Sequence, residues 1–375
     1  MRDVIDELVG WWADGKTAAV GTVVGTWKSS PRQPGASMAV GPDGTVVGSV
    51  SGGCVEGAVY ELAESARDTG VPVLERYGVS DDDAFAVGLT CGGIIDVFVE
   101  QVGPQSFPEL GSVAQDIADG NPVAVATLIS GPDADRVGRR LVVRPETASG
   151  SLGSTRLDDA VRDDARGLLV QGHTGTLHYG PDGERRGDDV TVFVASYAPQ
   201  PRMIVFGAID FAAAVARVGS FLGYRVTVCD ARATFATTKR FPDADEVVVE
   251  WPHRYLERTE VDARTVVCVT THDWKFDVPL LELALRMPLA YVGALGSRRT
   301  HEDRLEKLRE RGLTEEELAR LHSPIGLDIG ARTPEQTAVS IAAELILDQW
   351  GGSGSPLREL DGPMHHPPPG VTGVT

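Results

Sequence analysis

The chain has 375 residues, of which 42% are apolar and 24% charged, as in an ordinary soluble globular protein with two or three domains. Its formal net charge of −19 argues against a nucleic-acid surface, and no apolar run is long enough to span a bilayer. The first residues do not resemble a signal peptide, so we expect a cytoplasmic protein that binds neither nucleic acid nor membrane.

The cysteines suggest neither a zinc site nor a disulfide framework, because no two of them have Cys-x-x-Cys spacing. Cys229 and Cys268 lie inside strand-like runs and are expected to be small buried side chains. Cys54 and Cys91 each stand beside a pair of glycines.

The first elements lead the chain to Cys54. A proline-containing loop at 28–35 includes Ser30 and Arg32. Its hydroxyls and cations either hold a phosphate or carboxylate or form a solvated connection between strands. The elements expected around this loop are a helix at 4–12, then strands at 18–27, 37–40 and 45–50.

Residues 48–56 (GSVSGGCVE) join the end of a strand to the start of a helix. Apolar residues then recur every three or four positions up to Gly70, which suits a left-handed helix cap. Cys54 is therefore expected in the first helical turn, after Gly52 and Gly53, which let a ligand approach the backbone. Unpaired backbone N–H groups and the helix dipole would favour an anion there and ionise the thiol more readily.

A second glycine-and-cysteine element is found at residues 88–93 (GLTCGG), where Cys91 precedes Gly92 and Gly93. If both loops meet at one end of a sheet, they offer two sulfurs to a common ligand, for metal ligation or redox exchange. The alternative is that each glycine pair makes a turn and each cysteine packs into the core.

From residue 104 to residue 197, strands outnumber helices and do not alternate regularly with them. The N-terminal half is therefore expected to be an α+β domain. Its remaining elements are predicted as helices at 104–119 and 157–170 and strands at 122–129, 139–143 and 190–197.

A proline-rich joint at 198–201 precedes a strict alternation of apolar strands and helices. This pattern predicts a Rossmann-like, doubly wound parallel sheet covered by helices on both faces. We therefore expect an N-terminal domain at 1–198, a Rossmann-like domain at 199–350 and a disordered tail at 351–375. The expected strands are 203–206, 225–229, 246–250, 265–269 and 289–292, and the expected helices are 211–222, 278–286, 302–311, 314–321 and 333–350.

The first turn of the Rossmann-like domain, residues 207–212 (GAIDFA), matches the dinucleotide fingerprint at Gly207 and at its last position. Ile209 stands where a second glycine would admit the pyrophosphate. Asp230 ends the second strand, where an acid would bind the ribose hydroxyls. The sequence therefore predicts the fold with an impaired NAD(P) site, and another nucleotide or a vestigial site fits equally.

Two later loops follow strands at the edge where open α/β sheets bind ligands. His272 and Asp273 could transfer protons, or the imidazole could hold the loop. The next loop offers Gly296, Ser297 and Arg298 just before a helix, which suits a phosphate.

Five loops, found in the same order, resemble those of the XdhC/CoxI family, the accessory proteins of xanthine dehydrogenase and carbon monoxide dehydrogenase. The resemblance extends from the amino terminus to about residue 350 and implies a family-specific domain followed by a Rossmann domain. One departure is that residues 207–210 are GAID where family members often have GAGH. The five loops are residues 29–32, 48–56, 91–93, 293–299 and 324–331.

The resemblance implies a chaperone that binds the molybdenum cofactor, supports its sulfurated form and delivers it to a molybdenum hydroxylase apo-enzyme. A cysteine desulfurase is an implied partner, and a homodimer is compatible. Cys54 is the candidate molybdenum ligand or sulfur-handling group, Cys91 the second candidate, and Glu56 a group that holds or takes protons. The expected cofactor-binding residues are Ser30, Arg32, Gly52, Gly53, Gly92, Gly93, Gly207, Asp230, His272, Gly296, Ser297 and Arg298.

Two other functions remain open at this point. An NAD(P)-dependent oxidoreductase would use the Rossmann turn, with His272 as the acid, and would show hydride transfer. A regulatory sensor would bind a nucleotide and a partner protein without chemistry, and its interaction partners would distinguish it from a chaperone.

Overall fold

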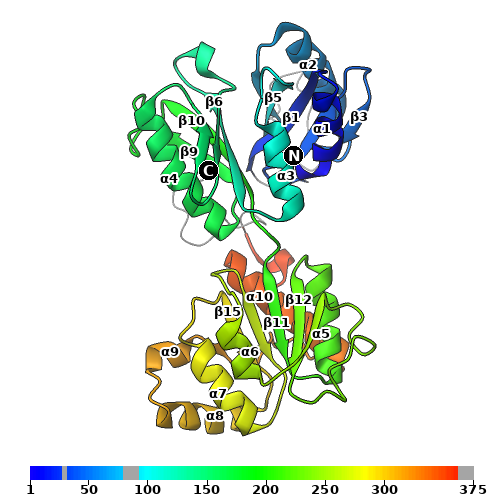
Figure 1. Ribbon diagram of the computed structural model, residues 1–375, viewed down its shortest axis with the longest axis vertical. Coiled ribbons are helices and arrows are strands. Elements are labelled where there is room, and N and C mark those ends of the chain that lie inside the picture. The colour runs from blue at the N-terminus through cyan, green and yellow to red at the C-terminus, as the bar shows by residue number, and fades with distance from the viewer. Residues whose placement is uncertain (28–31, 79–92, 362–375) are drawn as a thin grey trace. The chain divides into compact units, whose positions relative to one another are not determined.

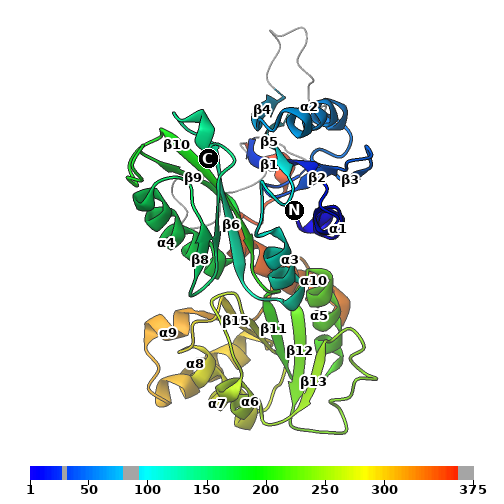
Figure 2. The same ribbon diagram turned by 45° about the horizontal axis from the view of Figure 1, so that its top comes forward.

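The computed structural model describes residues 1–27, 32–78 and 93–361. The described chain folds as two units (Figures 1 and 2): Met1–Pro199 together with residues 360 and 361, and Gln200–Glu359. Each unit has hydrophobic cores of its own. In the described part of the chain, no helix combines the length and the apolar character that a membrane span requires.

The first unit contains two five-stranded antiparallel sheets with the same strand order. The first sheet is ordered β3-β2-β1-β5-β4 and the second sheet β8-β7-β6-β10-β9. In each, three strands precede a helix and two follow it. The elements of the first sheet are β1 (Ala18–Trp27), β2 (Ser37–Val40), β3 (Val46–Gly48), α2 (Glu56–Thr69), β4 (Val73–Tyr77) and β5 (Ile94–Val102). Those of the second are β6 (Val123–Ser130), β7 (Arg140–Val143), β8 (Ala148–Gly150), α4 (Thr155–Gln171), β9 (Gly175–Tyr179) and β10 (Val190–Tyr197).

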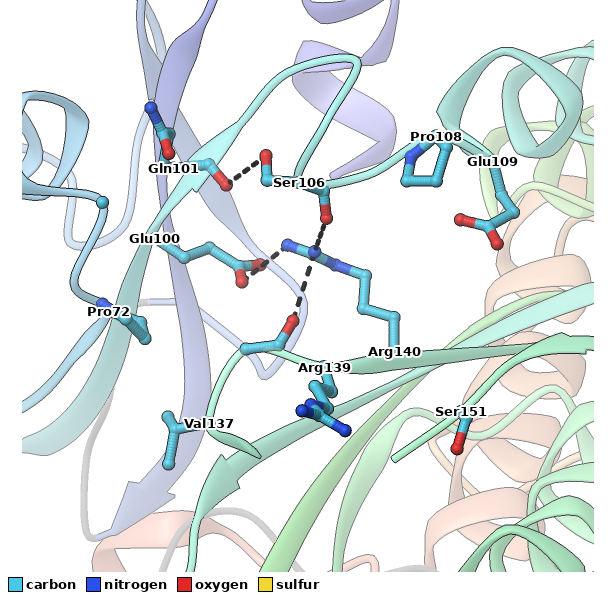
Figure 3. A pocket seen from close by; sticks show the side chains of 12 residues that line it. Pro72, Glu100, Gln101, Ser106, Pro108, Glu109, Val137, Arg139, Arg140 and Ser151 are labelled. Carbon is cyan, nitrogen blue, oxygen red and sulfur yellow. Dashed lines mark hydrogen bonds and ion pairs between the residues drawn. The ribbon is translucent and has the colours of Figure 1, made fainter. Parts of the chain in front are cut away.

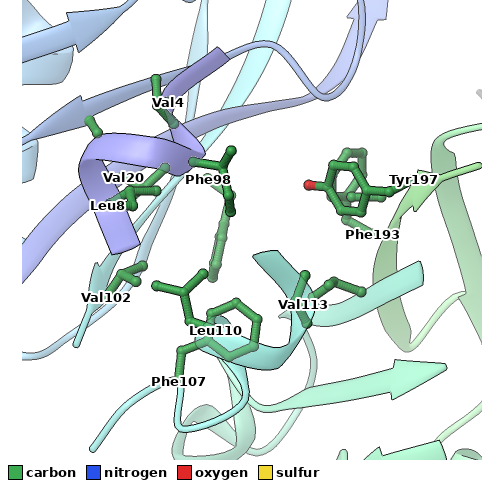
Figure 4. Close-up of a cluster of buried hydrophobic side chains, with 14 of the residues drawn as sticks. Val4, Leu8, Val20, Phe98, Val102, Phe107, Leu110, Val113, Phe193 and Tyr197 are labelled. Atoms are coloured by element: carbon green, nitrogen blue, oxygen red, sulfur yellow. The ribbon is translucent and has the colours of Figure 1, made fainter. Parts of the chain in front are cut away.

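The two sheets share one core between them (Figure 4), where Phe98 of β5 and Phe193 of β10 are buried. Leu8 and Leu110 add to this core from the two helices that stand outside the repeated pattern, α1 (Ile5–Ala13) and α3 (Leu110–Asp119). α2 covers the other face of the first sheet and α4 that of the second. The single turns η1 (Arg2–Val4) and η2 (Ala134–Arg136) complete the unit.

The second unit is a parallel six-stranded sheet, ordered β13-β12-β11-β14-β15-β16, between two layers of helices. α5 and α10 pack on one face, and α6, α7, α8 and α9 on the other. The strands are β11 (Arg202–Phe206), β12 (Arg225–Asp230), β13 (Glu246–Val249), β14 (Val266–Val269), β15 (Tyr291–Ala294) and β16 (Leu321–His322). The helices are α5 (Asp210–Phe221), α6 (Pro252–Arg258), α7 (Trp274–Ala284), α8 (Arg298–Glu310), α9 (Glu315–Ala319) and α10 (Pro334–Trp350).

The expected fold class, an α+β N-terminal region followed by a Rossmann-like parallel sheet, is confirmed. Helix α7 begins at Trp274, four residues before the expected start, because the Asp273 side chain caps it there. Pro279 lies inside the helix and does not end it. A proline in a helix interior removes a hydrogen bond, so the sequence indicated a later start. Of the expected tail, the described part up to residue 361 contains one turn, η3 (Leu357–Glu359), and the rest lies outside the described residues.

Candidate functional site

The loop between β3 and α2 is held by the carboxylate of Glu56. This group accepts hydrogen bonds from the N–H of Ser51 at 2.9 Å, the N–H of Gly53 at 2.8 Å and the Ser49 hydroxyl at 2.7 Å. The other N–H groups of residues 50–55 donate to Glu56 or to the hydroxyls of Ser49 and Ser51. Each N–H of residues 50–55 is therefore already bound within the loop.

This arrangement corrects the expectation of unpaired N–H groups that attract an anion. A carboxylate of the chain itself occupies the position that the helix dipole favours, so an incoming anion would have to displace Glu56. A ligand that binds at this loop would therefore contact its side chains and the exposed glycines, because the backbone N–H groups are already hydrogen-bonded.

Glu56 itself has an anchoring role in the structure. Burial raises the pKa of its carboxyl, but hydrogen bonds from the hydroxyls of Ser49 and Ser51 lower it to about 2. The group is ionised at neutral pH and has no proton to donate, and six donors already surround it. These contacts support a role for Glu56 in holding the loop, and its expected role in proton transfer stays a prediction.

Cys54 lies one residue before Val55, the N-cap of α2, and not in the first helical turn as expected. Gly52 and Gly53 have φ angles of 77° and 116°, which glycine adopts without strain, so the backbone departs from the helical path there. A Cβ added at either glycine would meet no described atom within 4 Å, and both glycines are exposed in the described part of the chain. The Cys54 side chain is partly buried against the core under α2.

The loop between β8 and α4 repeats this construction in the second half of the unit. The Ser151 hydroxyl donates to Asp158 at 2.7 Å, as Ser49 does to Glu56, and the N–H of Leu152 donates to the same aspartate. Both loops begin with a glycine at positive φ beside a carbonyl oxygen of the neighbouring strand. Identical residues recur at a constant offset of 102, in the pairs Gly48 and Gly150, Ser49 and Ser151, Val59 and Val161, Ala63 and Ala165, Gly70 and Gly172, and Tyr77 and Tyr179.

The two loops differ at the helix start. In the second loop the helix begins at Thr155, so Thr155 and Arg156 both belong to its first turn, where Arg156 is exposed. Their counterparts Gly53 and Cys54 precede the helix in the first loop. The carboxylate and the Gly-Ser start are therefore a common scaffold, whereas the glycine pair and the thiol belong to the first copy.

Three expected site residues, Ser30, Cys91 and Gly92, lie outside the described residues, so the meeting of the two cysteine loops stays a prediction. Gly93 is buried directly before β5. Arg32 forms an ion pair with Asp3 at 2.8 Å and lines a cavity of about 480 Å³ in the first unit. The other polar side chains of this cavity include Arg2, Gln33, Thr174, Ser196 and Tyr197.

The Rossmann turn approaches its neighbours closely at Gly207, where φ is 109° and an added Cβ would lie 2.7 Å from Thr270 and Thr271. Asp230 at the end of β12 is only 2% exposed. It accepts the N–H of Ala208 at 2.7 Å and both the backbone and the guanidinium of Arg232. Asp230 therefore ties the turn to β12 and does not face a ribose site.

Three expected residues of the second unit do come together. His272, Gly296 and Ser297 line one cavity of about 430 Å³ at the carboxyl ends of β14 and β15. Phe211 and Trp274 line it too, and sequence reasoning missed both. Arg298, the first residue of α8, is exposed and is not part of that lining.

The described residues contain no group of three His, Cys, Asp or Glu side chains that could hold a metal ion. Cys229 and Cys268 are buried as expected, and burial raises the pKa of both thiols to about 12. Cys54 is therefore the partly exposed thiol of the described chain. A partly exposed cysteine sulfur beside two exposed glycines fits a cofactor that brings most of its own metal ligands, because soft metals bind sulfur.

Two family models match the chain. Residues 203–345 match the XdhC Rossmann domain, and residues 11–78 and 116–180 match the XdhC and CoxI family. The last two stretches end at Gly78 and Gly180, which are equivalent residues of the two halves of the first unit.

Named relatives span nearly the whole chain. A protein of Bacillus subtilis (strain 168), named as a probable xanthine dehydrogenase subunit, is 28% identical over 335 residues, covering 89% of this chain and 93% of that protein. The molybdenum cofactor insertion chaperone PaoD of Escherichia coli (strain K12) is 27% identical over 348 residues, covering 92% and 87%. A crystal structure described as a xanthine dehydrogenase from Bacillus halodurans has 27% identity and a TM-score of 0.66, covering 92% of this chain and 95% of that one.

Proposed function

This chain belongs to the XdhC and CoxI family, and we propose that it is an accessory protein that inserts the molybdenum cofactor into a molybdenum hydroxylase. A relative of 27% identity that is named a molybdenum cofactor insertion chaperone supports the proposal. The alignment with that relative covers 92% of this chain, so the proposal concerns both units.

The observation that supports a cofactor site most directly is the difference between the two repeated loops. Both keep the carboxylate anchor and the Gly-Ser start, but only the loop of the first sheet has two glycines and a thiol at the helix start. Cys54 would hold the molybdenum of the cofactor or carry sulfur for it, since a thiolate suits a soft metal. The bound cofactor would supply the metal centre on which the client enzyme depends.

The surrounding residues would position the cofactor without reacting with it. Gly52 and Gly53 are exposed and would admit the pterin beside Cys54. Glu56 would hold the loop in the conformation that presents the thiol. Gly93, with Cys91 and Gly92, would contribute from the second glycine loop, and Arg32 would meet the cofactor phosphate.

We further propose the partners that this chemistry requires. A cysteine desulfurase would supply the sulfur for the sulfurated cofactor, and the apo-enzyme of a xanthine dehydrogenase or carbon monoxide dehydrogenase would receive it. A homodimer is compatible with this role.

The test is cofactor retention by a Cys54→Ser variant. Purified protein is incubated with molybdopterin, separated by gel filtration and assayed for pterin by fluorescence after oxidation. We expect the wild-type chain to retain the cofactor and Cys54→Ser to lose most of it. The matched control is Arg156→Ser, at the equivalent position of the second loop, which should retain the cofactor. Equal retention by Cys54→Ser and wild type would refute the role of this thiol.

An NAD(P)-dependent oxidoreductase is the second candidate, favoured by the positive φ of Gly207 in the Rossmann turn. The contacts of Asp230 and the side chain of Ile209 in that turn oppose it. This candidate predicts NAD(P)-dependent hydride transfer, which we do not expect.

A further inference from the structure

We propose that the second unit binds a ligand of mononucleotide size, namely one bicyclic heteroaromatic ring with one phosphate, at the cavity beside β14 and β15. A Rossmann sheet ordinarily binds a dinucleotide across the point where its strand order reverses, here between β11 and β14. In this unit, side chains of the protein occupy the half of such a site over β12, and the half beside β14 and β15 is a cavity.

The half over β12 is closed by Asp230. A carboxylate offers about four lone-pair positions, and Asp230 already receives four donors. They are the N–H of Ala208 at 2.7 Å and, from Arg232, the N–H at 2.8 Å, Nε at 3.0 Å and Nη2 at 2.8 Å. Because Asp230 is also 2% exposed, an adenosine ribose would find no acceptor there.

The turn that would bind a pyrophosphate is closed as well. The N–H of Ala208 donates to Asp230, and its carbonyl accepts from Arg240 at 3.0 Å. Ile209 replaces the second glycine of the fingerprint and packs against the core under α5. A pyrophosphate would therefore meet an occupied N–H and a branched side chain.

The other half is a cavity of about 430 Å³ with aromatic and polar sides. Phe211 at the start of α5 and Trp274 at the start of α7 provide aromatic rings, and His272 belongs to the same lining. Aromatic side chains bind heteroaromatic rings by stacking, which tolerates many ring types. A cavity of this size suits one ring system with a small substituent and not a dinucleotide.

The polar end of the cavity lies at the start of α8. The Ser297 hydroxyl caps this 13-residue helix by accepting the N–H of Thr300 at 3.1 Å, and the two hydroxyls lie 2.9 Å apart. Gly296 precedes them, and a Cβ added there would lie 3.5 Å from Nη1 of Arg304. Hydroxyls at a helix start with a guanidinium behind them suit a phosphate.

Arg304 lies behind the loop of Gly296 and supports this end of the cavity. Its side chain is fully buried, and it binds Asp277 at 3.3 Å, the Leu295 carbonyl at 2.9 Å and the Ser323 hydroxyl at 2.8 Å. Asp277 also binds the hydroxyl of Thr271. Nε of Arg304 has no hydrogen-bond partner in the described part of the chain. Through these contacts Arg304 fixes the loop of Leu295, which lines the cavity, to α7 and to the loop after β16.

This inference rests on the proposed function only in naming the physiological ligand, because the phosphorylated pterin of the molybdenum cofactor has this ring size and one phosphate. A purine mononucleotide has the same features. Guanosine monophosphate is therefore the first probe, and neopterin is the comparison that separates a pterin from a purine source.

The experiment titrates the full chain with guanosine monophosphate, guanosine, neopterin and NAD, following tryptophan fluorescence and heat of binding. We expect guanosine monophosphate to bind more tightly than NAD. Trp274→Leu should weaken it about tenfold, as loss of one stacking contact does. Ser297→Ala should weaken guanosine monophosphate severalfold and leave guanosine unchanged. Tighter binding of neopterin than of guanosine would assign the site to pterins.

The controls keep the outcome unambiguous. Trp251→Leu removes an exposed tryptophan outside the cavity lining and should bind like wild type. Circular dichroism of each variant checks its fold. Absence of binding by both guanosine monophosphate and neopterin, tighter binding of NAD, or full affinity in Trp274→Leu would overturn the proposal. Cys54→Ser should bind these probes normally, so a failure here and a failure of the Cys54 assignment are separate results.

Discussion

At the scale of single residues, Glu56 decides the geometry of the loop that presents Cys54. Its pKa of about 2 in the folded chain lies below the ordinary value of 4.5. Ionised Glu56 therefore stabilises the folded state above about pH 4.5, and this contribution is lost as the pH falls toward 2. The same carboxylate is thus both the anchor of the loop and a source of acid sensitivity.

We expect Glu56→Gln to lower the free energy of unfolding at pH 7 by about 1–3 kcal/mol, because an amide cannot accept from all the donors around it. Denaturant unfolding between pH 2 and pH 7 measures this, and the variant should lose less stability in acid than wild type does. Asp158→Asn is the matched control and should cost less, since Asp158 accepts from Ser151 and Leu152 only in the described contacts. Equal pH profiles for Glu56→Gln and wild type would contradict this account.

The sequence placed Cys54, Gly52, Gly53 and Glu56 in one loop, but it wrongly predicted unpaired N–H groups there, which the Glu56 carboxylate and two serine hydroxyls occupy. The Ser-x-Ser spacing before Glu56 was the available signal that the loop binds its own carboxylate. Whether a helix start is occupied depends on side-chain rotamers, which spacing does not determine. The hydrogen-bond partners of Asp230 could not be predicted from the sequence pattern either. Arg232 is exposed, and the pattern does not show that its guanidinium turns back to Asp230.

At the scale of elements, a buried ion pair joins the two sheets of the first unit (Figure 3). Glu100 of β5 and Arg140 of β7 are 2.6 Å apart, with side chains 11% and 6% exposed. Arg140 also donates to the carbonyls of Ser106 and Gly138 and lies over the ring of Phe107. Burial raises the pKa of Glu100, and Arg140 opposes that shift.

We expect Arg140→Ala to destabilise the chain by about 3–5 kcal/mol, because it leaves the Glu100 charge buried without its partner. The matched control is Arg76→Ala. Arg76 pairs with Asp96 at the same distance of 2.6 Å and also lies over an aromatic ring, but its side chain is 55% exposed. Loss of that pair should cost about 1 kcal/mol or less. Similar losses for the two variants in denaturant unfolding would show that burial is not the deciding factor.

Most elements were predictable because their hydrophobic periods are regular, and α10 with its Thr333 cap is an example. The strands β4 and β9 were missed. β4 is an edge strand whose central residues are exposed, so it shows no buried alternation. β16 has two residues, too few for any pattern.

At the scale of the whole molecule, each unit has its own buried cores, so the two units should unfold separately. We expect two transitions in calorimetry. Arg140→Ala should lower the midpoint of one, and Leu281→Ala, which empties a fully buried position in α7, should lower the other. A single transition that both variants shift together would show that the units unfold as one.

The duplicated fold of the first unit was open to discovery in the sequence, since identical residues recur at one fixed offset from Gly48 to Tyr179. They are few and separated by dissimilar residues, and the two sheets are needed to show that they are equivalent.

Because of this duplication, the thiol-bearing sequence of the first loop can be introduced into the equivalent loop of the second half. The second half already has the first glycine, the first serine and a carboxylate of the thiol-bearing loop. It has Ser154, Thr155 and Arg156 in place of the two glycines and the thiol, and Gly153 in place of Ser51, whose hydroxyl also donates to Glu56. Ser154→Gly, Thr155→Gly and Arg156→Cys together would place two glycines and a thiol in the second loop, without the hydroxyl that Ser51 gives the first. The chain thus contains one loop with a thiol and one without it. The residues that the two loops share, a glycine, a serine and a carboxylate, are those that the fold itself requires.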